Sequence, residues 1–291
     1  MNVVLDITGR NLRLYFRDRL NVFFSLLGAL VLFLLYTLFL GNQQTTGLAE
    51  SFPQASEEDI KGLVDAWMFA GIVGITAITT GLAAVNVIVD DTATGRFRDF
   101  LVSPISRGQL VLGYLLSTVV IALIMTTVVF AVSLAYLALL DGVTLTAGQV
   151  ARTYGYLVLS CAAFGALSSF IVSFVRTPGS FSALSTLVGT ILGFAAGSYI
   201  PVGAFPEGVR NFVSALPFMQ ASMVVRQEMT EGPMASVTDQ PEAVAEVERL
   251  FGITAYVGDW LVPVGYVVFV LVAMLVVFTA LAAVRIRSRI R

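Results

Sequence analysis

A polar segment at residues 90–109, with the sequence DDTATGRFRDFLVSPISRGQ, carries the most compact set of chemically distinctive residues in the chain. Arg96 and Arg98 alternate with Phe97, and Phe100 follows, so charge and aromatic surface lie together. Arginine and aromatic side chains are the types that dominate binding energy at protein interfaces. The composition is that of a surface that docks on another protein. An amphipathic loop resting on lipid headgroups is an equally good interpretation of these residues alone.

The segment is bounded by residues that start and stop helices. Thr92 or Thr94 can cap the N-terminus of a short helix, and Pro104 disfavours helical backbone at the residue before it. The S-x-x-Q sequence that starts at Ser106 has the form of a capping box, which begins a new helix. We therefore expect a two-turn helix at about residues 93–102, lying parallel to a membrane surface.

The composition of the chain indicates the elements that position this segment. Of 291 residues, 57% are hydrophobic and 12% are charged, whereas soluble domains carry about 25% charged residues. Six apolar runs of about 20 residues match the roughly 30 Å of a bilayer core. The sequence therefore predicts an all-α polytopic membrane protein. Its six transmembrane helices are expected at residues 21–40, 66–89, 110–140, 153–175, 180–199 and 261–284.

Residues 1–20 have the pattern of an amphipathic helix that precedes the first span. Asp6, Arg10, Arg13 and Arg17 are spaced by four, three and four residues and share one face, opposite leucine and phenylalanine. A basic face opposite an apolar face is typical of a helix in the membrane interface. The alternative is a plain basic flank of the first span.

The distribution of charge predicts the orientation of the spans. With both termini on one side, that side carries 12 basic and 5 acidic residues, and the other side carries 5 basic and 14 acidic residues. Loops on the cytoplasmic side of a membrane protein are enriched in lysine and arginine. Both termini and residues 90–109 are therefore expected in the cytoplasm.

Several classes of function are disfavoured by residue types that the sequence lacks. It contains no histidine, a single cysteine (Cys161) in an apolar run, and no GxxxxGK[ST] phosphate loop. These features disfavour a disulfide, a metal site and ATP binding by this chain. The spans show no clear ionisable side chain, which argues against an ion-coupled carrier, because coupling commonly uses such a group at membrane depth. We expect a chain that is not itself an enzyme.

Side chains in two of the expected spans are candidates for lining a path through the membrane. They are Met68, Phe69, Thr76, Thr79 and Asn86 in the second span, and Ser182, Thr186 and Thr190 in the fifth. A polar face on a span is more often a helix–helix contact, so packing is the alternative.

Three glycines of the fifth expected span recur every four residues. Gly189, Gly193 and Gly197 would share one helix face, and this spacing lets two helix backbones approach closely. We favour packing within the subunit over an interface with a second copy.

Residues 200–260 form a long segment between the fifth and sixth spans. Pro201, Pro206 and Pro217 divide its first half into short apolar pieces that are long enough to dip into the membrane but too short to cross it. Arg226 is expected at the outer interface, where its long side chain can reach water. The second half predicts a helix at residues 239–251, with Asp239 as N-cap.

The order of these elements resembles the membrane (permease) subunits of the type-two ABC exporter family, which move drugs, antibiotics, lipid-linked polysaccharides and related amphiphiles outward. The resemblance also includes residues 205–217 and Arg226, and the chain departs from the family pattern at Asp90 and Asp91, where a glutamate is expected. The motif residues that carry it are Thr94, Gly95, Phe100, Leu101, Ser103, Pro104, Ile105 and Arg107.

The resemblance implies a role for each part of the chain. Residues 1–20 would be a connecting helix that presents Arg10, Arg13 and Arg17, residues 21–291 the transmembrane permease domain, and residues 200–260 re-entrant and capping elements that close the exit. The cytoplasmic helix would be the coupling helix, which docks on a separate ATPase. Its contact residues would be Thr94, Gly95, Arg96, Phe97, Arg98, Asp99, Phe100, Leu101, Ser103 and Pro104.

The resemblance also implies partners and a location. Two ATPase subunits would bind ATP and Mg²⁺, and a second membrane subunit, either an identical copy or a close paralogue, would complete the transporter. No cofactor in this chain and no nucleic acid are expected. The location would be a bacterial plasma membrane. Spans rich in phenylalanine, leucine and hydroxyl groups favour a hydrophobic or amphiphilic, antibiotic-like cargo. A lipid or lipid-linked glycan exporter and a sensor subunit that does not transport are the alternatives.

Overall fold

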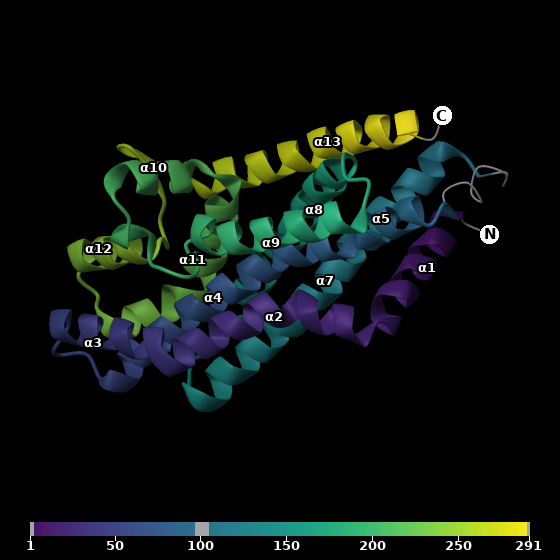
Figure 1. Ribbon diagram of the computed structural model, residues 1–291. Coiled ribbons are helices and arrows are strands. Elements are labelled where there is room, and N and C mark those ends of the chain that lie inside the picture. Colours follow the sequence, from purple (N-terminus) through teal and green to yellow (C-terminus); the bar gives the residue numbers. More distant parts are fainter. Residues whose placement is uncertain (1–2, 97–104, 290–291) are drawn as a thin grey trace.

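The computed structural model describes residues 3–96 and 105–289, with side chains as far as Arg285 at the C-terminal end. Within these residues the protein is almost entirely helical, and six helices are long and apolar enough to cross a membrane (Figure 1). The expected all-α polytopic fold is confirmed. The six spans are Arg19–Ser51, Glu57–Ala93, Arg107–Leu140, Ala147–Val172, Pro178–Ala195 and Val264–Arg285.

Shorter elements divide some of these spans and connect others. The first half of the chain contains α1 (Val3–Arg17), α2 (Arg19–Leu35), the π-helical turn η1 (Tyr36–Leu40), α3 (Gly41–Ser51), α4 (Glu57–Ala84), α5 (Asn86–Ala93) and α7 (Arg107–Leu140). The second half contains α8 (Ala147–Val172), α9 (Pro178–Ala195), the 3₁₀ turn η2 (Val202–Ala204), α10 (Glu207–Ala215), α11 (Pro217–Val237), α12 (Pro241–Phe251), β1 (Tyr256–Val257), β2 (Trp260–Leu261) and α13 (Val264–Arg289).

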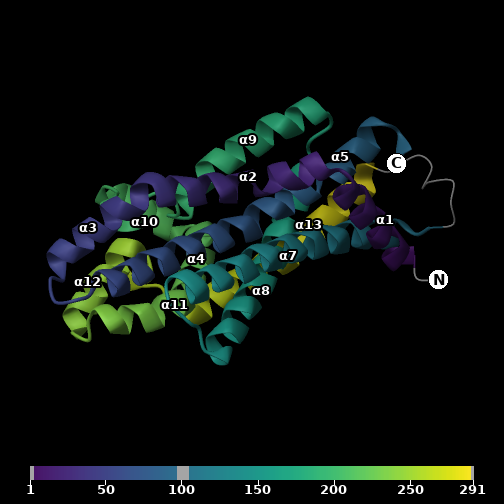
Figure 2. The same cartoon turned by 90° about the horizontal axis from the view of Figure 1, so that it is seen from below.

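Helix α4 lies at the centre of the bundle. It packs against α2, α7, α8 and α11, and its most apolar stretch is mostly buried in a single chain, unlike the corresponding stretches of α2, α9 and α13 (Figures 1 and 2). Both termini lie at the same end of the bundle, which we call the terminal end (Figure 1). Helices α3 and α12 lie at the opposite end.

Capping side chains determine where the spans begin. The capping box of Ser106 and Gln109 is present at the start of α7, as the sequence predicts. A second capping box, formed by Thr146 and Gln149, starts α8. Ser56 caps α4, because its hydroxyl accepts a hydrogen bond from the backbone N–H of Asp59. Without these caps, backbone N–H groups in the first turn of each helix would have no hydrogen-bond partner.

Two helices extend beyond the spans that hydropathy predicts. The first span was expected to end at residue 40, but the helix continues through η1 and α3 to Ser51. The second was expected to begin at residue 66, but α4 begins at Glu57. Hydropathy marks where a helix is apolar, whereas caps and backbone hydrogen bonds determine where it ends. The extra turns are polar and lie at the end opposite the termini.

The segment between α9 and α13 is more regular than the short pieces that the sequence predicts. Pro217 occupies the first turn of α11 and starts this 21-residue helix rather than interrupting one. Pro233 lies inside the same helix. Gln240, not Asp239, is the N-cap residue of α12. The hairpin of β1 and β2 was not predicted, because two-residue strands carry almost no periodic signal.

The three glycines of the fifth span have different surroundings. Helix α9 ends at Ala195, and Gly197 follows it with φ 61°, so Gly197 does not continue the helix face of the other two. A Cβ atom at Gly193 would lie 2.0 Å from the ring of Tyr199, whereas a Cβ atom at Gly189 would meet nothing within 4 Å. Gly193 therefore lies beneath the Tyr199 ring.

We predict opposite effects for alanine at two of these positions. Gly193→Ala places a methyl group in the space of the Tyr199 ring, and such overpacking costs about 1–3 kcal/mol. Gly189→Ala meets open space, so the higher helix propensity of alanine stabilises it by up to about 1 kcal/mol. Thermal unfolding of the purified protein in detergent measures both. Equal melting temperatures for the two variants would contradict the packing role of Gly193.

Candidate functional site

A buried carboxylate at the terminal end joins three parts of the chain. Asp91 lies in α5, and its side chain is 1% exposed. Arg10 of α1 donates hydrogen bonds from both terminal nitrogens to the two oxygens of Asp91, at 2.7 and 2.8 Å. The hydroxyl of Tyr114 in α7 donates to Asp91 Oδ2, and Arg96 lies 3.6 Å from Oδ1. We call these four residues the Asp91 cluster.

Helix α1 is held against α7 by further polar contacts and by one close packing contact. Asn11 Nδ2 donates to the hydroxyl of Ser117 at 3.0 Å. Thr8 Oγ1 donates to the carbonyl of Gly113 at 3.3 Å. A Cβ atom at Gly113 would lie 2.7 Å from Ile7 Cγ2, so only glycine permits this approach. These contacts position α1 so that Arg10 reaches Asp91.

The electrostatics of the Asp91 cluster favour a fixed geometry. A bidentate arginine–carboxylate pair is stronger than two neutral hydrogen bonds and restricts the relative orientation of its partners. Hydrogen bonding to Asp91 raises the pKa of Arg10, so the guanidinium stays charged. The Asp91 cluster therefore links α1, α5 and α7 through an ion pair and hydrogen bonds between side chains.

The expected coupling helix lies mostly outside the described residues. The described part shows that Thr94 ends α5 rather than starting a new helix, because its hydroxyl donates to the carbonyl of Asp90 at 2.7 Å. Thr92 lies inside α5, and Gly95 turns the chain with φ 75°. The predicted contact residues that lie outside the described residues are Phe97, Arg98, Asp99, Phe100, Leu101, Ser103 and Pro104.

A polar groove of about 290 Å³ lies beside the Asp91 cluster. It is lined by the end of α1, the start of α2 and by α5, and it includes Arg17, Asp18, Asp90 and Arg96. Arg17 and Arg13 of the expected connecting helix are both exposed, unlike Arg10. Of the three arginines predicted on one face of α1, only Arg10 reaches Asp91.

The candidate path residues fall into two sets that do not share a surface. Met68, Phe69 and Thr76 are buried in the core because α4 is covered by its neighbours. Thr79 is half-buried, and Asn86 donates to Asp90. Ser182, Thr186 and Thr190 are exposed on α9, where each threonine hydroxyl donates to the carbonyl four residues earlier.

An apolar cavity of about 200 Å³ lies between α9 and the neighbouring helices α4, α8 and α11. The rings of Phe164 and Phe218, which line it, are stacked with centroids 5.3 Å apart. Its other lining residues are almost all leucine, isoleucine and valine. The cavity can accommodate an apolar group, and its lining offers little hydrogen bonding.

Arg226 is buried at the opposite end of the bundle, which corrects the expectation that it lies at the outer interface. Its side chain is 0% exposed, because α11 packs along α4 beside the end of α9. Its guanidinium donates to the carbonyls of Ala196 and Gly197 at 2.8 and 2.7 Å, and to that of Gly252 at 3.4 Å. It also lies 5.5 Å from the ring centroid of Trp67.

The acceptors of Arg226 lie where two helices end. Ala196 and Gly197 follow α9, and Gly252 follows α12, so the cation meets the negative ends of both helix dipoles. Burial lowers the pKa of Arg226 to about 10, which leaves it charged at neutral pH. Trp67 contributes to the same junction, since its indole N–H donates to the carbonyl of Phe251 at 2.6 Å.

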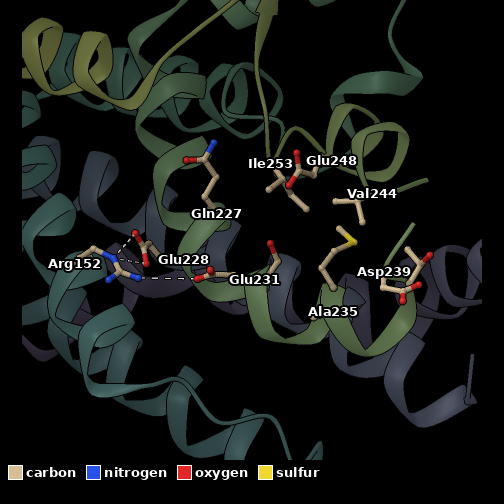
Figure 3. A pocket seen from close by; sticks show the side chains of 12 residues that line it. Arg152, Gln227, Glu228, Glu231, Ala235, Asp239, Val244, Glu248 and Ile253 are labelled. Carbon is tan, nitrogen blue, oxygen red and sulfur yellow. Dashed lines mark hydrogen bonds and ion pairs between the residues drawn. The ribbon is translucent and has the colours of Figure 1, made fainter. Parts of the chain in front are cut away.

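A larger cavity, of about 500 Å³, lies between α8, α11 and α12 (Figure 3). At one side, Arg152 Nε donates to both oxygens of Glu228, at 2.8 and 2.9 Å. Gln149 donates to Glu231 at 2.8 Å, which ties the start of α8 to α11. Burial raises the pKa of Glu248 on α12, another lining residue. The cavity lies at the end of the bundle that the charge count predicts to be acidic.

Residues 4–229 match the family model of the ABC-2 type transporter. The chain belongs to the ABC-2 type transporter family. This ABC-2 transporter is therefore a multi-pass membrane subunit, and its family is a transport component rather than a catalytic one. The comparison with curated proteins gives no match. The matched residues run from α1 into α11 and include Arg10, Asp91 and Arg226, whereas α12 and the hairpin lie beyond them.

The sequence indicated one part of the Asp91 cluster and missed another. The two aspartates before Thr94 stood out as a departure from the family pattern, but only the structure shows that Asp91, and not Asp90, is buried. Tyr114 was not predicted, because nothing in the pattern of a span indicates that one tyrosine meets a carboxylate 23 residues away.

We predict that Asp91→Asn destabilises this ABC-2 transporter more than Asp90→Asn. Breaking a buried ion pair costs about 3–5 kcal/mol, and partial exposure of Arg10 places the expected loss near the lower value. Asp90 is half-buried and accepts only from Asn86 in the side-chain contacts described, so it is the matched control. Hydrogen exchange of the α1 amides measures the release of this helix. Equal exchange in both variants would show that the ion pair does not hold α1.

We predict that Arg226→Met loosens the ends of α9 and α12. Each buried carbonyl left without a donor costs about 1–3 kcal/mol, and methionine removes the donors to Ala196 and Gly197. Arg210→Met, on the half-buried surface of α10, is the control and is expected to change stability by less than about 0.5 kcal/mol. Melting temperatures in detergent compare the two. A stable Arg226→Met variant would contradict the role of this guanidinium.

Proposed function

We propose that this ABC-2 transporter forms the membrane path of an ATP-driven exporter. The observation that carries the proposal is the ion pair of Arg10 with Asp91, which joins α1 to α5 immediately before residues 97–104. In this proposal, residues 93–102 dock on an ATPase subunit, and α1 lies beside that contact. A displacement of the docked segment would then move α1, α5 and α7 together.

Helices α4 and α5 supply a route for that displacement. They form one continuous span from Glu57 to Ala93, which at 1.5 Å per residue measures about 55 Å. Asp91 lies near the C-terminal end of this span, and Trp67, which lies over the guanidinium of Arg226, is in its N-terminal third. Motion produced by ATP hydrolysis on the partner would therefore reach the elements that close the opposite end.

We propose that the complete transporter contains two copies of the ATPase and a second membrane subunit, either an identical copy or a close paralogue. Helices α2 and α9 bury little of their apolar surface within one chain, which supports a partner on this face. The exposed hydroxyl groups of Ser182, Thr186 and Thr190 on α9 would then line the path between the two membrane subunits. ATP and Mg²⁺ would bind to the ATPase subunits.

The proposed cargo is a hydrophobic or amphiphilic compound of the drug or antibiotic type. The apolar cavity beside α9 supports this class, because it offers apolar contacts and little hydrogen bonding. A sugar phosphate would need charged donors that the lining does not supply. The proposed setting is a bacterial plasma membrane, with the terminal end and its basic residues in the cytoplasm.

We predict that Arg96→Glu combined with Arg98→Glu abolishes capture of the ATPase. The affinity-tagged chain, purified from membranes of its native cells, is expected to retain a protein with a phosphate loop and nucleotide hydrolysis. Reversal of both charges places like charge against a partner surface that is matched to arginine. Arg176→Glu is the control, because Arg176 is an exposed basic residue that follows α8.

Three measurements separate the outcomes of this experiment: the mass spectrum of the retained proteins, their ATPase activity, and the melting temperature of the variant. Loss of the ATPase from a normally folded double variant supports the proposal. Undiminished retention and hydrolysis in that variant would contradict docking at residues 93–102. A retained ATPase without any efflux from the cells would favour the sensor role over export.

A further inference from the structure

A surface groove of about 500 Å³ lies at the terminal end of the bundle, where α8 is followed by α9. Its walls are apolar and include Phe170 and Phe174, whereas Arg176 and Ser180 line it in the connection between the two helices. None of the described residues that line it is acidic. Helix α13 packs along α8 beside the groove (Figure 1), and the ring of Phe278 lies 5.6 Å from that of Phe170. The groove therefore combines apolar walls with a basic edge.

This groove adjoins the apolar cavity beside α9. Ile171 and Leu184 line both spaces. From these two residues, the cavity of about 200 Å³ continues between α8 and α9 toward Phe164 and Leu192, away from the terminal end. We call the groove and the cavity together the α8–α9 site. The site carries charge at one end and hydrocarbon surface along the rest of its length, which is the arrangement of an amphiphile.

Two arginines supply positive charge at the terminal end of the α8–α9 site. Arg176 is exposed and takes part in none of the ion pairs between described residues. The guanidinium of Arg285 lies over the ring of Phe174, 4.8 Å from its centroid. Arg285 is the last residue of the final membrane span, and Arg176 lies just beyond the span of α8. Long basic side chains at the ends of spans reach the headgroup region, so both charges lie near the depth of lipid phosphates.

We propose that the α8–α9 site binds one anionic phospholipid from the leaflet at the terminal end. The lipid phosphate lies between Arg176 and Arg285, because paired guanidinium N–H groups match the geometry of phosphate oxygens. One acyl chain passes Ile171 and Leu184 and enters the apolar cavity. The bilayer core is as apolar as the cavity, so the arginines rather than the acyl chain select this lipid.

Other occupants match the α8–α9 site less completely. A soluble phosphate contacts the arginines but leaves the apolar cavity unused, and an uncharged apolar compound does the reverse. A zwitterionic lipid carries an amine next to its phosphate, and two nearby guanidinium groups repel that amine. The inference goes beyond the proposed export function, because lipid binding needs neither ATP nor an ATPase. Each of the two proposals can therefore fail while the other stands.

A photoreactive lipid tests where the acyl chain lies. The probe is phosphatidylglycerol with a diazirine on one acyl chain, at low mole fraction in phosphatidylcholine vesicles that contain the purified full-length protein. After illumination, mass spectrometry identifies the labelled peptides. Saturable labelling is expected in α8 and α9, between residues 164 and 192. Unlabelled phosphatidylglycerol is expected to displace the probe, although phosphatidylcholine is already present in large excess.

Removal of charge tests the contacts with the headgroup. Arg176→Gln combined with Arg285→Gln is expected to raise the mole fraction of probe at half-maximal labelling by about thirtyfold, because each arginine near an anionic headgroup contributes roughly fivefold in affinity. Lysine at both positions keeps the charge and is expected to keep most of the labelling. Arg13→Gln combined with Arg19→Gln is the control, because it removes two exposed arginines from the terminal end outside the site. All four arginines are exposed, so the variants are expected to fold.

Five results would each overturn the inference. If the double variant at Arg176 and Arg285 is labelled as strongly as the control, the arginines do not bind the headgroup. If unlabelled phosphatidylglycerol does not displace the probe, the groove holds ordinary bilayer lipid. If glycerol phosphate in the water displaces the probe equally well, the ligand is a soluble phosphate. If saturable labelling lies outside α8 and α9, the lipid binds elsewhere. If α8 and α9 stay unlabelled and a bifunctional crosslinker joins them to another copy, a second subunit covers the groove.

Discussion

The packing of the bundle depends on the buried guanidinium of Arg226, which supplies hydrogen-bond donors to backbone carbonyls at helix ends. Helices that end within a packed protein core leave backbone carbonyls without partners unless a side chain supplies the donors. Arg226 donates to such carbonyls after both α9 and α12, and it lies over Trp67 of the central helix. One buried cation therefore holds the end of α9, the end of α12 and the central helix α4 together. A positive charge is tolerated there because the carbonyl groups of helix C-termini carry partial negative charge.

The Asp91 cluster links neighbouring helices in the same way near the C-terminal end of the α4–α5 span. There the buried group is the carboxylate of Asp91. Its partners are Arg10 of α1, Tyr114 of α7 and Arg96, which follows α5. The α4–α5 span is thus tied to neighbouring elements near both of its ends and is buried along much of its length. Helices α2, α9 and α13 are tied less tightly and leave apolar surface for other molecules. A buried central helix surrounded by helices with exposed apolar surface fits a multi-pass membrane subunit, because the outer helices face lipid or other subunits.

The residues of the sequence predicted the fold well and the site only in part. The six spans, the capping box of Ser106 and the all-α class follow from hydropathy and from local hydrogen bonding, which operate over a few residues. The pairing of Arg10 with Asp91 spans 81 residues, and no local pattern contains it. Arg226 was assigned to the interface because its side chain is charged. The structure buries it because the carbonyl groups at two helix ends supply acceptors and Trp67 supplies an aromatic face. Sequence patterns over a few residues do not show that acceptors from distant segments will compensate for burying a charge.

The sequence by itself determined that this protein is an all-α chain with six segments long and apolar enough to cross a membrane, and that it resembles an ABC exporter subunit. These properties depend on composition and on short-range periodicity, so they survive without any knowledge of tertiary contacts. The tertiary structure alone decided which aspartate is buried, where Arg226 lies, and that Gly193 lies beneath Tyr199 while Gly197 turns the chain. Those outcomes depend on which distant side chains meet. The free energy of burying a charge or a ring is set by its neighbours in space.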